Sequence, residues 1–353
     1  MNPRRSIYEK DGKRMLERKD SARKNILMLM ALSGGVMKKS ICEEICGSKA
    51  YYGVVMKRMK DAGEAETIFG QKPKTLHIKR KGVEAIAKNI PWLMDLYEKR
   101  LLTFNKTKNQ RLSDISQIIY NMQLIGVDYY PLEKRCLFRE KTEKSIDCSG
   151  NMAYYTPMEV KQLEMDELRG SRLCGLLVGG GCSYILYNME DHNIKFNKKT
   201  EMNASMAIHK YCVPLNACKN VVFGNGFGMC EKILQNGEIE TSRAFQQKTE
   251  NYNFLTPEPD FYYIPNGKSG SVYLKALLRP EHIRDIEAGI KDREAMEIVN
   301  LLPIHLPTLV HIKRSSGNLA VLCLDGQKEF VKNLNERVKI FTVPEKDLLA
   351  YLG

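Results

Sequence analysis

The sequence predicts a chain of mixed α and β class, α+β at its N-terminal end and α/β at its C-terminal end. Three observations support this class. The first 90 residues combine short amphipathic helices with one hairpin pattern, a helical stretch without strand signals follows, and strand and helix patterns then alternate to the C-terminus. We therefore expect a basic flexible arm over residues 1–20, a small domain over 21–90, a helical connector over 91–150 and an α/β domain over 151–353.

Positive charge is concentrated in the first 100 residues. The 353 residues carry 55 Lys and Arg against 42 Asp and Glu, a net charge of +13. Residues 1–100 hold 23 of these basic residues and 12 of the acidic ones, whereas the remainder holds 32 and 30. A surplus confined to one end of a chain is typical of a surface that meets a polyanion.

The elements of the small domain follow from local signals. Ser21 is a candidate N-cap for a first helix that ends before Gly34-Gly35, and a second helix covers Lys38–Cys46. After Gly47-Ser48 a third helix runs from Lys49 to Ala62 and ends at Gly63. Two strands, Glu66–Phe69 and Thr75–Ile78, flank a turn of basic and turn-forming residues, and a last helix covers Val83–Lys88. Three helices, a hairpin and a closing helix predict a winged helix-turn-helix.

This arrangement suits double-stranded DNA, because an α-helix fits the major groove while a basic hairpin reaches the neighbouring phosphates. The candidate DNA-binding residues lie on the third helix and around the hairpin: Lys49, Tyr51, Tyr52, Lys57, Arg58, Lys72, Lys74, Lys79 and Arg80. The alternative is a winged helix that binds proteins, in which Tyr51, Tyr52 and Met56 belong to the core.

Composition bounds the rest of the chain. The N-terminus is charged rather than apolar, and no run of about 18 apolar residues predicts a membrane span, so we expect a cytoplasmic protein without membrane contact. The ten cysteines are scattered through apolar segments and form no Cys-x-x-Cys pair, which predicts reduced, buried thiols and no zinc site. The connector has two apolar helical stripes, which we interpret as packing surfaces or as a means of pairing two copies of the protein.

The C-terminal domain alternates strands and helices. Strands are expected at Leu173–Val178, Tyr184–Asn188, Asn220–Phe223, Asp260–Ile264, Ser271–Leu277, Leu309–Ile312, Leu319–Leu324 and Lys339–Val343, and helices at Met202–Tyr211, Gly228–Leu234, His282–Ile290 and Gln327–Val338. The segment Gly224–Gly228 lies between a strand and a helix, but its glycine spacing matches neither the dinucleotide fingerprint nor the phosphate loop.

One pair of residues has the spacing of a metal-dependent nuclease core. Asp260 begins a predicted strand, and Lys275 lies on the next, where such nucleases place an acidic-x-Lys motif that holds magnesium and activates water. Tyr273 occupies the position of the second carboxylate, and a single carboxylate holds a hard cation poorly. We therefore expect a degenerate nuclease-like scaffold with no catalytic residues, no cofactor and no metal; the alternative is a metal-dependent nuclease or nicking enzyme that uses Asp260 and Lys275.

The order of these features resembles a known family. The resemblance rests on Lys79-Arg80-Lys81-Gly82 at the start of the last helix of the small domain, the helical connector, the segment Ser171–Leu177 and the Pro259-Asp260 strand. In these features the chain resembles the replication-relaxation proteins of plasmids and integrative conjugative elements. The resemblance implies a protein that binds duplex DNA at a replication or transfer origin, or at an operator. Its partners would be a relaxase, replication proteins or a second copy of the chain.

Overall fold

The computed structural model divides into two compact units. The first comprises Met1–Lys141, Asn151–Leu163 and Cys174–Leu176, and the second comprises Thr142–Gly150, Glu164–Leu173 and Leu177–Gly353. The residues that the structure describes are 22–68, 73–89, 91, 94, 106–131, 134–137, 145–161, 166–190, 196–213, 218–241, 261–291, 297–317 and 319–352.

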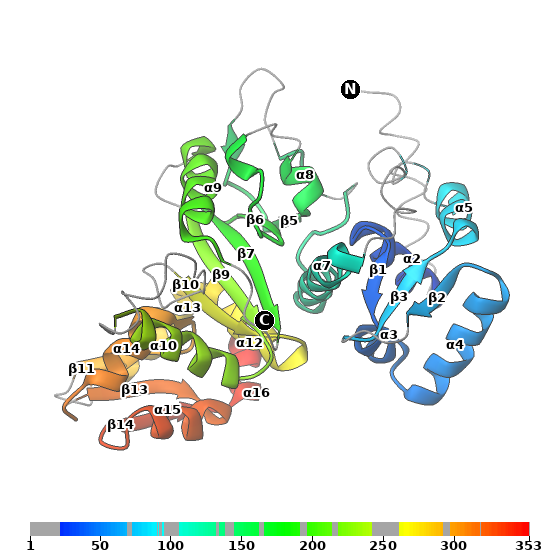
Figure 1. Cartoon of the computed structure of the whole chain (residues 1–353). Coiled ribbons are helices and arrows are strands. Elements are labelled where there is room, and N and C mark those ends of the chain that lie inside the picture. The colour runs from blue at the N-terminus through cyan, green and yellow to red at the C-terminus, as the bar shows by residue number, and fades with distance from the viewer. Residues whose placement is uncertain are drawn as a thin grey trace. The chain divides into compact units, whose positions relative to one another are not determined.

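The first unit begins with three helices and a small sheet (Figure 1). In chain order its elements are α2 (Ala22–Leu32), β1 (Val36–Lys38), α3 (Lys39–Cys46), α4 (Lys49–Asp61), β2 (Ala65–Ile68), β3 (Thr75–Ile78), α5 (Arg80–Asn89), α7 (Lys106–Ile125), β5 (Ala153–Tyr155) and α8 (Pro157–Lys161). The helices and hairpin strands predicted for residues 21–90 lie within a few residues of these bounds. Strand β1 was not predicted, because three residues show no measurable alternation.

The small sheet has the order β1-β3-β2 and is antiparallel throughout. The central strand β3 pairs Leu76 with Met37 on one side and with Thr67 on the other. Helix α2 packs on this sheet and on the other short helices, and all residues from Ile26 to Leu32 are buried. The sheet and helices therefore share one core, built around α2.

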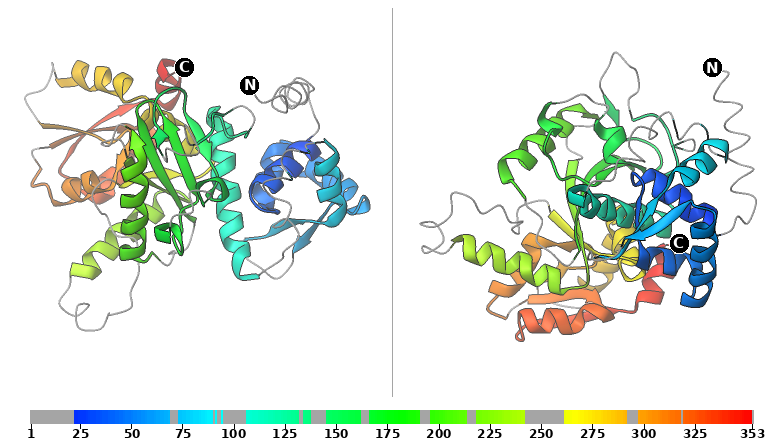
Figure 2. Two further views of the ribbon diagram at one scale, coloured as in Figure 1. Left: turned by 90° about the horizontal axis from the view of Figure 1, so that it is seen from above. Right: turned by 45° about the vertical axis from the view of Figure 1, so that its right-hand side comes forward.

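Helix α7 belongs to the same unit and packs against β1 and α2. It adjoins β1 at one edge of the small sheet, whereas α4 adjoins β2, the strand at the other edge (Figures 1 and 2). The predicted connector stripe that includes Ile115, Ile118 and Met122 is confirmed as buried helix. The earlier stripe around Trp92 lies outside the described residues.

The largest sheet has six strands in the order β12-β10-β9-β7-β6-β5. Strands β7, β9 and β10 are parallel, and β12 is antiparallel to β10. The elements from residue 146 on, besides β5 and α8, are β4 (Ile146–Asp147), η1 (Asp166–Leu168), β6 (Gly175–Gly179), β7 (Cys182–Glu190), α9 (Lys198–Tyr211), β8 (Cys212–Val213), β9 (Cys218–Gly224), α10 (Gly228–Thr241), β10 (Phe261–Pro265), η3 (Lys268–Gly270), α12 (Ser271–Leu278), α13 (Pro280–Lys291), β11 (Glu297–Asn300), β12 (Ile304–His305), α14 (Leu306–Arg314), β13 (Leu319–Leu324), η4 (Asp325–Gln327), α15 (Lys328–Leu334), β14 (Lys339–Val343) and α16 (Glu345–Leu352).

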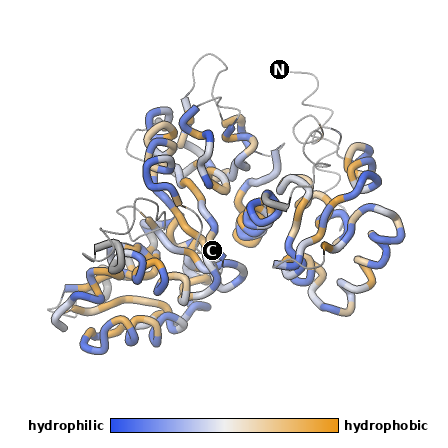
Figure 3. The backbone as a smooth tube through the Cα atoms, in the orientation of Figure 1, coloured by the Kyte–Doolittle hydropathy of each residue, from blue (hydrophilic) through white to orange (hydrophobic). Residues whose placement is uncertain are grey.

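A second, fully parallel sheet of three strands has the order β11-β13-β14. Its central strand β13 is buried at every position, and it appears as a continuous hydrophobic stretch in Figure 3. A buried parallel strand reads as an unbroken apolar run. The sequence prediction of a mixed-sheet α/β region is thereby confirmed at the level of fold class.

Two predicted strands are wrong, because both segments are helices. Ser271–Leu278 forms α12, in which five of eight residues are buried aliphatic or aromatic side chains. Leu309–Ile312 lies inside α14, which has Pro307 in its first turn. A short apolar run does not distinguish a strand from a buried helix by periodicity, and in α14 the proline was the missed start signal.

Candidate nucleic-acid interface

Helix α4 presents an exposed basic face in the first unit. It begins after Ser48, whose side chain accepts a hydrogen bond of 3.2 Å from the Tyr51 amide. Such a cap satisfies one of the amides that a helix leaves without a partner in its first turn. Tyr52, Val55, Met56 and Met59 form its buried face. The remaining side chains of the helix face solvent.

The exposed face of α4 carries Lys49, Lys57, Arg58 and Lys60, and Asp61 is the acid of that face. Within the described parts of the chain, none of these four basic side chains makes an ion pair or hydrogen bond through its charged group. Four basic side chains against Asp61 leave this face with a surplus of positive charge, which favours a polyanion as its partner. Lys49, Lys57 and Arg58 lie on this exposed helix face, and their role in DNA binding stays a prediction.

Tyr52 was predicted to lie at the interface, and this prediction is wrong. Its side chain is only 8% exposed, and it packs among the core residues of α3 and α4. The Lys39 ammonium lies 5.6 Å from the centre of its ring. Burial raises the pKa of the Tyr52 hydroxyl above its ordinary value. Tyr51, one residue earlier, is 43% exposed, so the adjacent tyrosines divide between core and surface.

The hairpin β2–β3 carries a weaker positive field than its sequence suggests. Lys74 is exposed, but the Lys79 ammonium lies 3.1 Å from Glu66, and Arg80 lies 3.2 Å from Glu84. Surface pairs of this kind contribute little to stability, yet each offsets a positive charge. Lys72 lies outside the described residues. Of the hairpin candidates that the structure describes, Lys74 therefore keeps its charge without an acidic neighbour.

Buried polar contacts hold α7 against this region. The Lys38 ammonium donates to Gln117 over 3.1 Å, and His77 Nε2 lies 2.8 Å from Asn109 Oδ1. Burial lowers the pKa of the His77 imidazole, so the ring is neutral at pH 7. Buried polar groups are costly unless they are hydrogen-bonded, so these pairs favour one position of α7 on the sheet.

The predicted nuclease pair is not formed by two strands. Lys275 lies on helix α12, not on a strand beside β10, and Asp260 lies outside the described residues. The strand pair that would align an acidic-x-Lys motif with the preceding strand is thus replaced by a helix. Among the described residues no group of three or more His, Cys, Asp or Glu side chains has a metal-binding arrangement.

A cluster of amides occupies the carboxyl ends of the parallel strands. Asn266 donates to Asn188 over 3.0 Å and to Asn225 over 3.1 Å, and the Asn266 backbone amide donates to Gly224. Tyr263 donates its hydroxyl hydrogen to the Gly226 carbonyl. These bonds tie the ends of β7, β9 and β10 to each other, so the Gly224–Gly228 segment serves here as a strand-to-helix turn.

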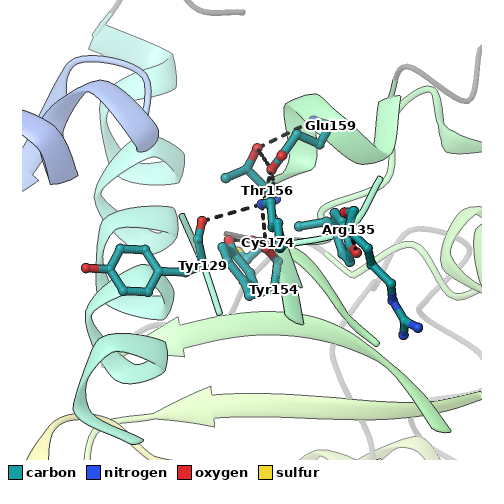
Figure 4. A network of polar contacts seen from close by, with 8 residues as sticks. Tyr129, Arg135, Tyr154, Thr156, Glu159 and Cys174 are labelled. Atoms are coloured by element: carbon teal, nitrogen blue, oxygen red, sulfur yellow. Dashed lines mark hydrogen bonds and ion pairs between the residues drawn. The ribbon is translucent and has the colours of Figure 1, made fainter. Parts of the chain in front are cut away.

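The first unit also contains a buried ion pair, between Lys134 and Glu159 (Figure 4). The ammonium lies 2.8 Å from the Glu159 carboxylate and donates to the Tyr154 carbonyl over 2.6 Å. Burial lowers the pKa of Lys134, and the charge of Glu159 opposes that effect. Thr156 donates to Glu159 through its amide and its hydroxyl. The pair therefore ties residues near Lys134 to β5 and α8, which is a structural role.

Comparison of the chain with protein-family profiles, with characterised proteins and with solved structures finds no match. No helix within the described ranges combines the length and the apolar character needed to cross a bilayer.

Proposed function

We propose that residues 22–89 are a winged helix-turn-helix that binds duplex DNA, with α4 in the major groove and the β2–β3 hairpin over neighbouring phosphates. The element order from α2 to α5 and the antiparallel sheet order β1-β3-β2 support this proposal. An α-helix of this kind enters the major groove with its first residues toward the bases.

The exposed face of α4 is the observation that carries the proposal. Lys57, Arg58 and Lys60 project from its second half and make no ion pair within the described chain, although Asp61 lies on the same face. Phosphates repeat along both strands of DNA, so several unneutralised cations on one helix gain more from a duplex than from an isolated anion. If this basic face served only to keep the protein soluble, the protein would bind DNA no better than other polyanions.

The role of the DNA contact follows from the family resemblance. We propose recognition of a replication or transfer origin, or of an operator, of a mobile genetic element in the cytoplasm. The α/β region would bind a relaxase, a replication protein or a second copy of the chain. The position of Lys275 on a helix disfavours the alternative of a nuclease built from two strands.

The test measures binding of the full-length protein to duplex DNA by fluorescence anisotropy at several salt concentrations. We expect affinity to fall steeply as salt rises, because binding releases counterions. Arg58→Ala and Lys57→Ala should each weaken binding and reduce the slope of log affinity against log salt by about 1 if the side chain contacts a phosphate.

Lys210→Ala is the matched control, since Lys210 is an exposed lysine on α9 in the second unit. It should leave affinity and slope unchanged. Absence of binding at low salt would refute the proposal. Equal losses from Lys210→Ala and Lys57→Ala would show that overall charge, and not α4, binds DNA.

A further inference from the structure

Helix α4 exposes apolar side chains as well as charged ones, and between Lys49 and Lys57 its exposed residues carry no charge. Tyr51 is 43% exposed and Val54 46% exposed, and Ala50 lies beside them on the surface. All three belong to the first half of the helix. Lys57, Arg58 and Lys60 belong to the second half.

The helical period shows which way these side chains point. At about 3.6 residues per turn, Ala50, Val54 and Lys57 lie opposite the buried row that runs from Tyr52 to Met59. Tyr51 lies one turn before Val54 on the side of Arg58. After Lys49 the outward face therefore starts with an apolar surface and ends with three basic residues and one acidic one, Asp61.

A recognition helix directs its N-terminal residues to the base edges and uses other positions for the backbone. Ala50 and Val54 have no side-chain group that can hydrogen-bond to a base. The apolar group that a base pair presents in the major groove is the C5 methyl of thymine. We propose that Val54, with Ala50 and Tyr51, packs against thymine methyl groups and so makes the protein prefer A·T pairs at these positions.

This inference rests on the proposed function, and it assigns base recognition to Val54. Charge favours DNA over a protein as the occupant of this surface, because three cations that make no ion pair follow the apolar patch and outnumber the one acid there, Asp61. An apolar protein partner would leave them without partners. In DNA, the phosphates on either side of a thymine would pair with these three cations.

Gly53 is consistent with a close approach of this helix to its ligand. A Cβ added there would meet no atom within 4 Å, so packing inside the protein does not require a glycine. Glycine in a helix interior is destabilising relative to alanine. A glycine on the same outward half of the helix as Ala50 and Lys57 lets the backbone come nearer to a groove.

The experiment compares two duplex copolymers that differ only in the methyl group, poly(dA-dT) and poly(dA-dU). The full-length protein is titrated with each by fluorescence anisotropy at the same low salt. We expect binding to the uracil polymer to be weaker by about fourfold for each thymine methyl group that the protein covers, the factor that one buried methyl group typically contributes. Val54→Ser should reduce the preference for the thymine polymer, because only the contacts of Ala50 and Tyr51 remain.

Met206→Ser is the control, because Met206 is a similarly exposed apolar side chain, 58% exposed, on α9. It should keep the preference for the thymine polymer, and circular dichroism should show that both variants are folded. Equal binding of the two polymers by the unsubstituted protein would overturn the inference and leave the proposed function standing. An undiminished preference in Val54→Ser would also overturn it. Failure to bind either polymer would refute the proposed function itself.

Discussion

The buried pair of Lys134 and Glu159 allows a quantitative test of the interior of the first unit. The Lys134→Met substitution removes the charge and keeps a chain of similar length. The Lys134 side chain is 2% exposed and that of Glu159 is 12% exposed, so the carboxylate would lose its cation without gaining much water. Breaking a buried pair in this way costs about 3 to 5 kcal/mol. The two hydrogen bonds from Thr156 remain and place the expected loss near the lower limit.

The double variant Lys134→Met/Glu159→Gln separates the effect of the stranded charge from that of the missing ion pair. A neutral amide oxygen still accepts from Thr156, and replacing a buried ion pair by neutral groups is often nearly neutral. We therefore expect the double variant to be more stable than Lys134→Met by about 2 kcal/mol, a coupling typical of residues that touch. The free energy of unfolding is measured by urea titration, with hydrogen exchange of the β5 and α8 amides to locate the change.

Lys199→Met on α9 replaces an exposed lysine and should change stability by less than about 0.5 kcal/mol. The reasoning would be refuted if Lys134→Met cost less than about 1 kcal/mol. It would also fail if the double variant were no more stable than the single one.

Three further predictions concern other parts of the chain. Gly53→Ala should stabilise the protein by about 1 kcal/mol, because the added methyl group meets no other atom and alanine favours a helix. The same substitution should weaken DNA binding. Thermal unfolding measures the stability and fluorescence anisotropy the affinity, and a gain in affinity would contradict a close approach of the α4 backbone to DNA. Burial lowers the pKa of Lys134 in the folded protein below its ordinary 10.5, so between the folded and the unfolded pKa the unfolded chain binds more protons. The free energy of unfolding, relative to that of Lys134→Met, should therefore rise with pH through that range. Urea titrations at increasing pH measure this difference, and a difference that falls with pH would contradict the assigned cause. The protein with magnesium or manganese should leave supercoiled plasmid intact, and Lys275→Ala should bind DNA as the unsubstituted protein does; nicking that disappears in Lys275→Ala would show catalysis.

The sequence predicted most of the first unit because its signals are local. Ser48 and Gly63 bound α4 by capping and by a left-handed turn, and both are visible without a fold. It was harder to predict which side of α4 faces the core, since either Tyr51 or Tyr52 could begin the row of buried residues. The spacing of Tyr52, Val55, Met56 and Met59 is the signal that resolves it, and it also places Val54 on the surface.

The errors of the C-terminal prediction have a different cause. The helix Ser271–Leu278 is buried on nearly all sides. Its apolar residues therefore lie on nearly every side, without the alternation of polar and apolar faces that marks a surface helix. A helix of this kind has no polar face to reveal its period. Ion pairs such as that of Lys134 with Glu159 join segments 25 residues apart, and no local pattern specifies which charged residues meet in the interior.

The packing of α7 bears on how this protein can be dissected. Helix α7 provides Gln117, which accepts a hydrogen bond from Lys38, and Asn109, which is hydrogen-bonded to His77. A fragment that ends near residue 90 lacks α7, so Lys38 and His77 would lose these partners. A hybrid protein that borrows this region should therefore carry residues 22–125 as one piece. The exchangeable part of the chain is therefore longer than residues 22–89 and includes α7.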